Sequence, residues 1–277
     1  MRTMSSRRDF LAQGGGVMVA ALAGTPTQAA RRTPMIDCHA HAGHAPALTD
    51  PWTTIADPEE ILRRNREAGI DQSVIFPISN DTFEKANQEI AGICRKFAGH
   101  FIGYAKHDPE TEKGRIRAML IRECNELGLR GLKLHVHPGP EVLDTVAELG
   151  IPVIYHPARV ALIEEISRDY PTVDFILAHL GADMSYDWRE HLAAIEMARR
   201  HQNVYLDTGA VVLTRYIEQA VHELGAEKII FGSDEPEVDC RLEIFKIRML
   251  ELPKLQEEKI LGGNLQRLLG KYRGKAA

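Results

Sequence analysis

Four histidines and one aspartate stand where they could hold a metal ion together. His39 and His41 form a His-x-His pair in an apolar segment, and side chains two residues apart on a strand point to the same side. His156, His179 and Asp234 each end another apolar run and precede a loop signal. Burying such groups unpaired would cost roughly 1–3 kcal/mol for each group, whereas a metal ion satisfies them together. His-x-His alone is a weak motif, but the five residues together indicate a metal site.

The elements that would position these residues are indicated by short apolar runs separated by helix signals. The expected strands cover residues 35–41, 72–78, 100–106, 129–136, 152–156, 174–179, 203–207 and 228–234. Helices are expected to begin at Asp57, Asn80 and Asp108, and to cover residues 141–149 and 185–201. Eight strands alternating with helices predict an α/β fold, a closed (β/α)₈ TIM barrel rather than an open doubly wound sheet. Barrel active sites lie at the C-terminal ends of the strands, where this chain carries its candidate residues.

Residues 1–30 have the layout of an export signal. Arg7 and Arg8 precede a short, Gly-rich apolar run, and small residues close the segment. This twin-arginine pattern predicts two parts, a cleaved signal over residues 1–30 and one barrel domain over residues 31–277. The mature protein is expected to be periplasmic or secreted, with no membrane association after cleavage.

The composition narrows the classes of partner. The 277 residues carry a formal net charge of −5, and no basic stretch is dense enough to indicate nucleic-acid binding. The four cysteines are scattered without a C-x-x-C spacing, so buried thiols are expected. A small-molecule substrate is the expected partner, and a homo-oligomer is left open.

Five segments give the chain a resemblance to a known family. They are Ile36-Asp37-Cys38-His39-Ala40-His41, Gly131-Leu132-Lys133-Leu134-His135, Pro152-Val153-Ile154-Tyr155-His156, Ala178-His179-Leu180-Gly181 and Phe231-Gly232-Ser233-Asp234-Glu235-Pro236. In these segments and their order the chain resembles the amidohydrolase superfamily, within it the amidohydrolase-related branch (amidohydrolase 2) that includes aminocarboxymuconate-semialdehyde decarboxylase. The resemblance implies a metal-dependent enzyme and does not specify a substrate.

The resemblance also implies a ligand set, in which His39, His41, His156 and Asp234 hold one divalent metal. Zn²⁺ is expected because it suits three imidazoles and a carboxylate with one open position, and Mn²⁺ or Fe²⁺ would also fit. His179 would be a further ligand or the group that polarises the substrate. The metal would lower the pKa of a bound water to about 7, and Asp234 would take the proton and return it to the leaving group.

Four further residues are candidates for the pocket wall. Related enzymes with two metals bridge them by a carbamylated lysine on the fourth strand, whereas the lysine of a Lys-Leu-His segment in this branch is usually not a ligand. Lys133, His135 and His137 would share one face of the fourth strand and line the pocket beside a single metal. Arg159 could bind a substrate carboxylate through two hydrogen bonds, or it is a surface arginine.

Three functions fit these expectations. The first is a metal-dependent hydrolase acting on a small-molecule ester, lactone or amide, and the second is a non-oxidative decarboxylase of the same branch. The third is an exported binding protein without catalysis, against which Asp234 argues because a pure binder needs no base. The expected export favours the hydrolase, since decarboxylation usually serves intracellular catabolism. Two or more cationic groups beside the metal would favour a carboxylated substrate.

Overall fold

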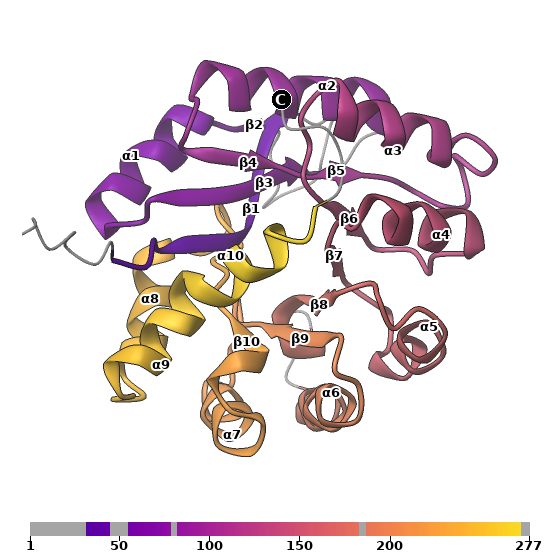
Figure 1. The fold of residues 1–277 in the computed structure, drawn as a ribbon. Coiled ribbons are helices and arrows are strands. Elements are labelled where there is room, and N and C mark those ends of the chain that lie inside the picture. Colours follow the sequence, from indigo (N-terminus) through magenta and orange to yellow (C-terminus); the bar gives the residue numbers. More distant parts are fainter. Residues whose placement is uncertain (1–31, 45–54, 79–81, 183–186, 273–277) are drawn as a thin grey trace, which may run out of the picture. The chain divides into compact units, whose positions relative to one another are not determined.

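Parallel strands alternate with helices throughout the part of the chain that the computed structural model describes, residues 32–44, 55–78, 82–182 and 187–272. The strands are β1 (Ile36–His44), β2 (Ile55–Ala56), β3 (Gln72–Pro77), β4 (Phe101–Gly103), β5 (Ala105–Lys106), β6 (Leu132–Leu134), β7 (Val153–Tyr155), β8 (Phe175–Leu177), β9 (Val204–Asp207) and β10 (Ile229–Ile230). The helices are α1 (Pro58–Ala68), α2 (Phe83–Lys96), α3 (Ile116–Asn125), α4 (Pro140–Leu149), α5 (Ile163–Asp169), α6 (Trp188–Arg200), α7 (Arg215–Leu224), α8 (Cys240–Arg248), α9 (Lys254–Glu258) and α10 (Asn264–Leu269). The helices surround the strands (Figure 1).

The strands form a ring that closes at two seams. Parallel pairing joins β1, β3 and β4 in one sheet and β5 through β10 in the other, while β2 is a short antiparallel strand on β1. β4 and β5 are consecutive parts of one strand interrupted at Tyr104, which connects the two sheets. At the other seam the Cys38 N–H donates to the Phe231 carbonyl (2.9 Å) and the Asp234 N–H donates to the His39 carbonyl (2.7 Å). The (β/α)₈ barrel predicted from the sequence is confirmed.

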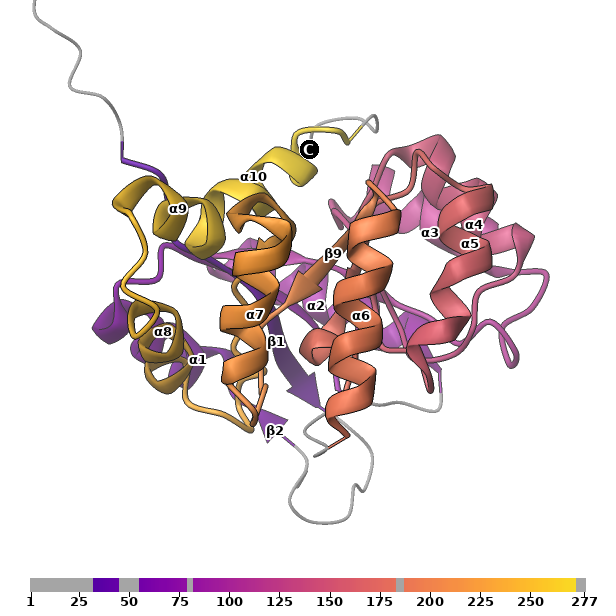
Figure 2. The same cartoon turned by 90° about the horizontal axis from the view of Figure 1, so that it is seen from below.

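Two apolar layers hold the barrel together. Successive side chains on a strand face opposite sides, so on β7 the side chain of Ile154 fills the interior while Val153 and Tyr155 pack under the helices. Leu265 and Leu268 of α10 join the interior layer, so this helix packs against the barrel interior. Figure 2 shows α6, α7 and α8 outside β1 and β9.

Capping residues in the sequence predict both ends of α1 correctly but predict the start of α3 wrongly. Asp57 caps α1, and Gly69 ends that helix in the left-handed conformation, as expected. The helix expected from Asp108 is wrong, because α3 begins only at Ile116. The Asp108 N–H instead donates to the Glu112 side chain (3.0 Å), and the Glu112 N–H donates back to the Asp108 carbonyl (3.0 Å). This closed loop of hydrogen bonds holds residues 108–112 in turns.

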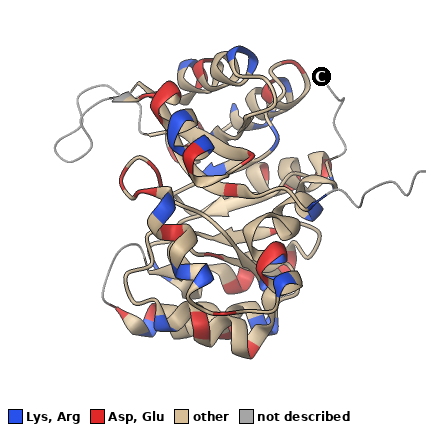
Figure 3. Cartoon of the chain, turned by 90° about the vertical axis from the view of Figure 1, so that its left-hand side faces the viewer, with Lys and Arg blue, Asp and Glu red and all other residues tan. Residues whose placement is uncertain are grey.

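The surface of the described chain shows mixed charge. Figure 3 shows Lys and Arg residues interspersed with Asp and Glu along the outer helices. All four cysteines are free, and three of them are buried. In the described segments every helix is too short or too polar to cross a bilayer. The expected export signal, residues 1–30, lies outside the described residues.

Candidate metal centre

The candidate ligands predicted from the sequence meet at the C-terminal ends of the strands. Nε2 of His39 and Nε2 of His41 lie 3.1 and 3.3 Å from the same atom, Oδ1 of Asp234. The His179 ring lies 4.8 Å from the His39 ring, and the His156 ring lies 5.0 Å from the His179 ring, between centroids. The five residues come from strands that are far apart in the sequence, and the structure brings all of them together.

Asp207, a carboxylate that the sequence analysis did not select, holds His39 in place. His39 donates from Nδ1 to Oδ2 of Asp207 over 2.5 Å, which leaves Nε2 as the nitrogen that faces Asp234. The other oxygen, Oδ1, accepts the Gly209 N–H at 2.7 Å. A Cβ atom on Gly232 would lie 2.1 Å from Oδ1, so only glycine lets the chain pass this close. Asp207 ends the seventh predicted strand, and that position was the signal that could have identified it.

A left-handed turn after β8 presents His179. His179 and Leu180 have φ angles of 53° and 50°, which are unfavourable for residues with a Cβ atom. Two hydrogen bonds hold this turn in place. His179 donates from Nδ1 to the Gly209 carbonyl (2.8 Å), and the buried His191 donates from Nδ1 to the Leu180 carbonyl (3.1 Å). Because Nδ1 is taken by the first bond, Nε2 is the nitrogen through which His179 would act as a ligand or on the substrate.

Asp234 follows β10 in a second left-handed position, with φ 65°. The buried carboxylate of Asp37 ties this loop to β1. It accepts the His39 N–H (3.0 Å), the Ser233 N–H (2.9 Å) and the Ser233 hydroxyl (2.6 Å). One side chain thus positions both the His-x-His strand and the Asp234 loop.

Burial keeps three imidazoles of the centre, those of His39, His41 and His156, neutral. Burial, with the charge of Lys133, holds the pKa of His39 well below its usual range and lowers that of His156 to about 2. Burial lowers the pKa of His41 to about 4. Burial alone would raise the pKa of Asp234, but the hydrogen bond with His41 and the nearby positive charges hold it below its ordinary value. Neutral imidazoles around an ionised carboxylate are the donor set that a divalent metal requires, so the residues present fit a metal.

Lys133 lies in the centre itself. Its side chain is fully buried, and Nζ lies 3.2 Å from Nε2 of His39 and 5.1 Å from the centroid of the Phe76 ring. Lys106, at the end of β5, pairs in register with Lys133 and is also buried. Lys106 ends the third predicted strand but is not among the candidate residues predicted from the sequence.

The two histidines that follow Lys133 differ from expectation. β6 ends at Leu134, so the alternation expected for Lys133, His135 and His137 on one strand face does not extend to the histidines. His135 is exposed, and its ring lies 5.1 Å from the His156 ring, at the mouth of the barrel. His137 is hydrogen-bonded through Nδ1 to the Tyr155 hydroxyl (3.2 Å), and Tyr155 packs in the layer under the helices. The structure does not bring His137 into contact with the candidate ligands.

Arg159 is exposed on the segment after His156. Its backbone carbonyl accepts the Leu162 N–H at 3.1 Å, at the start of a short 3₁₀ turn. The structure gives the guanidinium no contact with the candidate ligands among the described residues.

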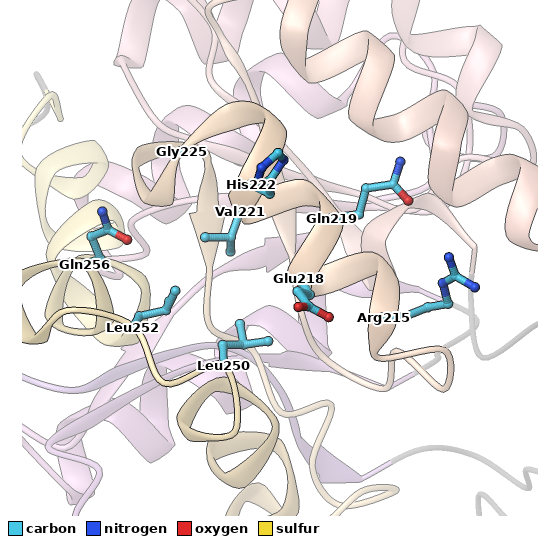
Figure 4. A pocket seen from close by; sticks show the side chains of 9 residues that line it. All are labelled: Arg215, Glu218, Gln219, Val221, His222, Gly225, Leu250, Leu252 and Gln256. Atoms are coloured by element: carbon cyan, nitrogen blue, oxygen red, sulfur yellow. The ribbon is translucent and has the colours of Figure 1, made fainter.

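A groove of about 960 Å³ lies on the outside of the barrel. It is formed between α7 and the segment after α8 (Figure 4). Its lining residues are Arg215, Glu218, Gln219, Val221, His222, Gly225, Leu250, Leu252 and Gln256. None of these is a candidate ligand, so the groove is separate from the candidate metal centre.

Comparisons with known proteins place the chain in a family. A family model described as "Amidohydrolase" matches residues 36–271. A 2-keto-4-carboxy-3-hexenedioate hydratase from Sphingobium sp. (strain NBRC 103272 / SYK-6) is 23% identical over 282 residues, covering 72% of this chain and 82% of the hydratase.

Solved structures of similar fold include enzymes of more than one class. One is a dihydroxybenzoic acid decarboxylase from Polaromonas sp. JS666 with bound manganese and the inhibitor 2-nitroresorcinol. It has a TM-score of 0.69 and 18% identity, covering 86% of this chain and 97% of that chain. Another is a probable 2-pyrone-4,6-dicarboxylic acid hydrolase from Acinetobacter baumannii with citric acid bound. It has a TM-score of 0.68 and 17% identity, covering 85% of this chain and 99% of that chain.

Proposed function

Because the chain belongs to the amidohydrolase family, we propose that it is a metal-dependent hydrolase that opens an ester, lactone or amide bond in a small molecule. The observation that carries the proposal is the approach of Nε2 of His39 and Nε2 of His41 to one oxygen of Asp234. Two imidazole nitrogens and a carboxylate oxygen, buried close together, are groups that bind a cation.

The proposed ligands are His39, His41, His156 and Asp234, holding one divalent metal. Imidazole and carboxylate ligands favour Zn²⁺, and Mn²⁺, which a similar structure contains, also fits this set. When bound, such a metal supplies Lewis acidity and makes water more acidic. The amine of Lys133 lies beside His39 and is assigned to the substrate rather than to a second metal.

The chain's own residues then have distinct tasks. Asp207 fixes the His39 ring so that Nε2 faces the centre. The Asp234 carboxylate accepts a proton from the attacking water and returns it to the leaving group. His179, whose Nδ1–H is held by the Gly209 carbonyl, uses Nε2 to ligate or to polarise the bond that breaks.

Non-oxidative decarboxylation is the second candidate. Two buried lysines, Lys106 and Lys133, at the mouth of the barrel favour a substrate that carries a carboxylate. The dihydroxybenzoic acid decarboxylase of similar fold supports the same interpretation. The two candidates are distinguished by the product, because only decarboxylation releases carbon dioxide.

Asp234→Asn tests the proposal. The amide keeps the size of the side chain and one ligand oxygen but cannot act as a base, so turnover should fall by roughly 10²–10⁴-fold while much of the metal remains. The assay uses whichever member of a lactone, ester and amide panel the wild type hydrolyses, with the metal content of each sample measured by elemental analysis.

His156→Ala is the matched comparison and should lose metal and activity together. An Asp234→Asn variant with full metal and near wild-type kcat would refute the role of Asp234 as the base.

A further inference from the structure

Lys106 is a buried cation at the mouth of the barrel to which the proposed hydrolysis gives no task. It ends β5 and is the register partner of Lys133 on β6. Paired residues on neighbouring parallel strands point to the same face, about 4.8 Å apart between strands. Lys133 faces the interior, where its Nζ lies 3.2 Å from Nε2 of His39. The two lysines therefore extend side by side toward the candidate metal centre.

The hydrogen bond and the ring contact of the Lys106 ammonium are both with uncharged groups. The residue is 7% exposed, and its Nζ donates to the carbonyl of Ile78 and lies 5.5 Å from the centroid of the Phe83 ring. Among the described residues no carboxylate forms an ion pair with Lys106. A buried charge in this state is costly, and a bound anion would offset the cost.

The pair of lysines also borders the candidate ligands. Burial and then the charge of Lys133 lower the pKa of Lys106 to about 7, which reflects two positive charges close together in a poorly solvated place. Lys133, the register partner of Lys106, has its Nζ 3.2 Å from Nε2 of His39. An anion between the two lysines would therefore lie within electrostatic reach of the centre.

We propose that Lys106 and Lys133 together form a subsite for a carboxylate of the substrate. Each ammonium can donate one hydrogen bond to a carboxylate oxygen, and such charge-assisted bonds are roughly twice as strong as neutral ones. The substrate class is then a small organic acid whose reacting bond lies beside the subsite. This inference rests on the proposed function, because it places the subsite next to the proposed reaction centre.

Isothermal titration of matched ligand pairs tests the subsite. The probes are benzoate with benzamide and glutarate with glutaramide, which differ in charge but hardly in shape. Wild-type protein should bind at least one carboxylate roughly tenfold more tightly than its amide, the usual worth of a hydrogen bond between charged groups. Lys106→Met keeps the length of the side chain and should abolish this preference, while Lys106→Arg should keep part of it.

Lys113→Met is the control, because Lys113 is exposed in the loop that follows β5. It should leave the preference unchanged. The inference is overturned if the wild type shows no preference for either carboxylate, or if Lys106→Met retains the wild-type preference. Circular dichroism of each variant shows whether the fold is intact. A preference that is lost in Lys106→Met and partly kept in Lys106→Arg supports the subsite.

Elemental analysis of the same samples separates this inference from the proposed function. A chain that contains its metal but shows no carboxylate preference refutes the subsite alone. A chain that never contains metal but shows a preference that depends on Lys106 refutes the proposed function alone.

Discussion

Replacing Asp207 by asparagine should weaken metal binding without removing any proposed ligand. Both oxygens of this carboxylate face N–H donors, with His39 Nδ1 at 2.5 Å and the Gly209 N–H at 2.7 Å. Asparagine offers only one oxygen, so its NH₂ group must face a donor. If it faces His39, the proton of that ring moves to Nε2, the nitrogen that the metal needs. If it faces Gly209, a buried backbone N–H loses its acceptor.

The size of the effect follows from this arrangement. Losing a carboxylate that orients a histidine ligand typically costs 10–100-fold in metal affinity, or about 1.4–2.8 kcal/mol. The assay is competition for Zn²⁺ between the protein and a chromophoric chelator at neutral pH. His39, His41, His156 and Asp234 remain unchanged in this variant, so a loss of affinity reports on how Asp207 positions the centre through His39 and Gly209.

Asp174→Asn is the matched control. Asp174 precedes β8, and its carboxylate pairs with Lys271 at 2.7 Å, so the same chemical change occurs with no contact to the centre. It should bind Zn²⁺ as the wild type does. Unchanged affinity in a folded Asp207→Asn protein, or an equal loss in Asp174→Asn, would refute the reasoning.

Two further predictions concern the buried histidine after β5 and the start of the chain. Burial alone would lower the pKa of His107, but hydrogen bonds of 2.8 Å to each of Glu112 and Glu123 raise it to about 9. The folded pKa exceeds the unfolded one, so this stabilisation, about 3 kcal/mol, is complete below about pH 6.5 and is lost as the pH rises through 9. Urea unfolding should show a smaller fall in stability over that range for His107→Gln, and an unchanged fall would contradict the assignment. We also propose that residues 1–30 direct export, so replacing Arg7 and Arg8 by lysine should leave full-length, active protein in the cytoplasm, with normal export in cell fractionation as the contrary result.

The candidate ligands were predictable because each closes an apolar run, at a position that a barrel must place at its mouth. His39, His41, His156, His179 and Asp234 stand out in this way, since their residue types are unusual directly after buried strands. The same apolar runs predicted the ring of strands, and the structure has these strands.

Other features depend on contacts that no local pattern encodes. Asp207 and Lys106 also end strands, but their tasks depend on His39 and Lys133, which come from other strands. His137 follows β6 in sequence, yet it turns to the Tyr155 hydroxyl because the strand ends at Leu134.

Helix starts depend on long-range contacts as well. Asp108 followed by proline is a typical helix start, and here it opens a turn because Glu112 binds His107 and the Asp108 N–H.

The most direct test of the proposed metal centre is anomalous X-ray diffraction from crystals of the protein purified without added metal. We expect one anomalous peak in each chain, at the edge of Zn or another divalent transition metal. The peak should lie about 2.0–2.2 Å from Nε2 of His39, Nε2 of His41, a ring nitrogen of His156 and a carboxylate oxygen of Asp234. Two peaks bridged by Lys133, or a peak held by Asp207 in place of Asp234, would contradict it.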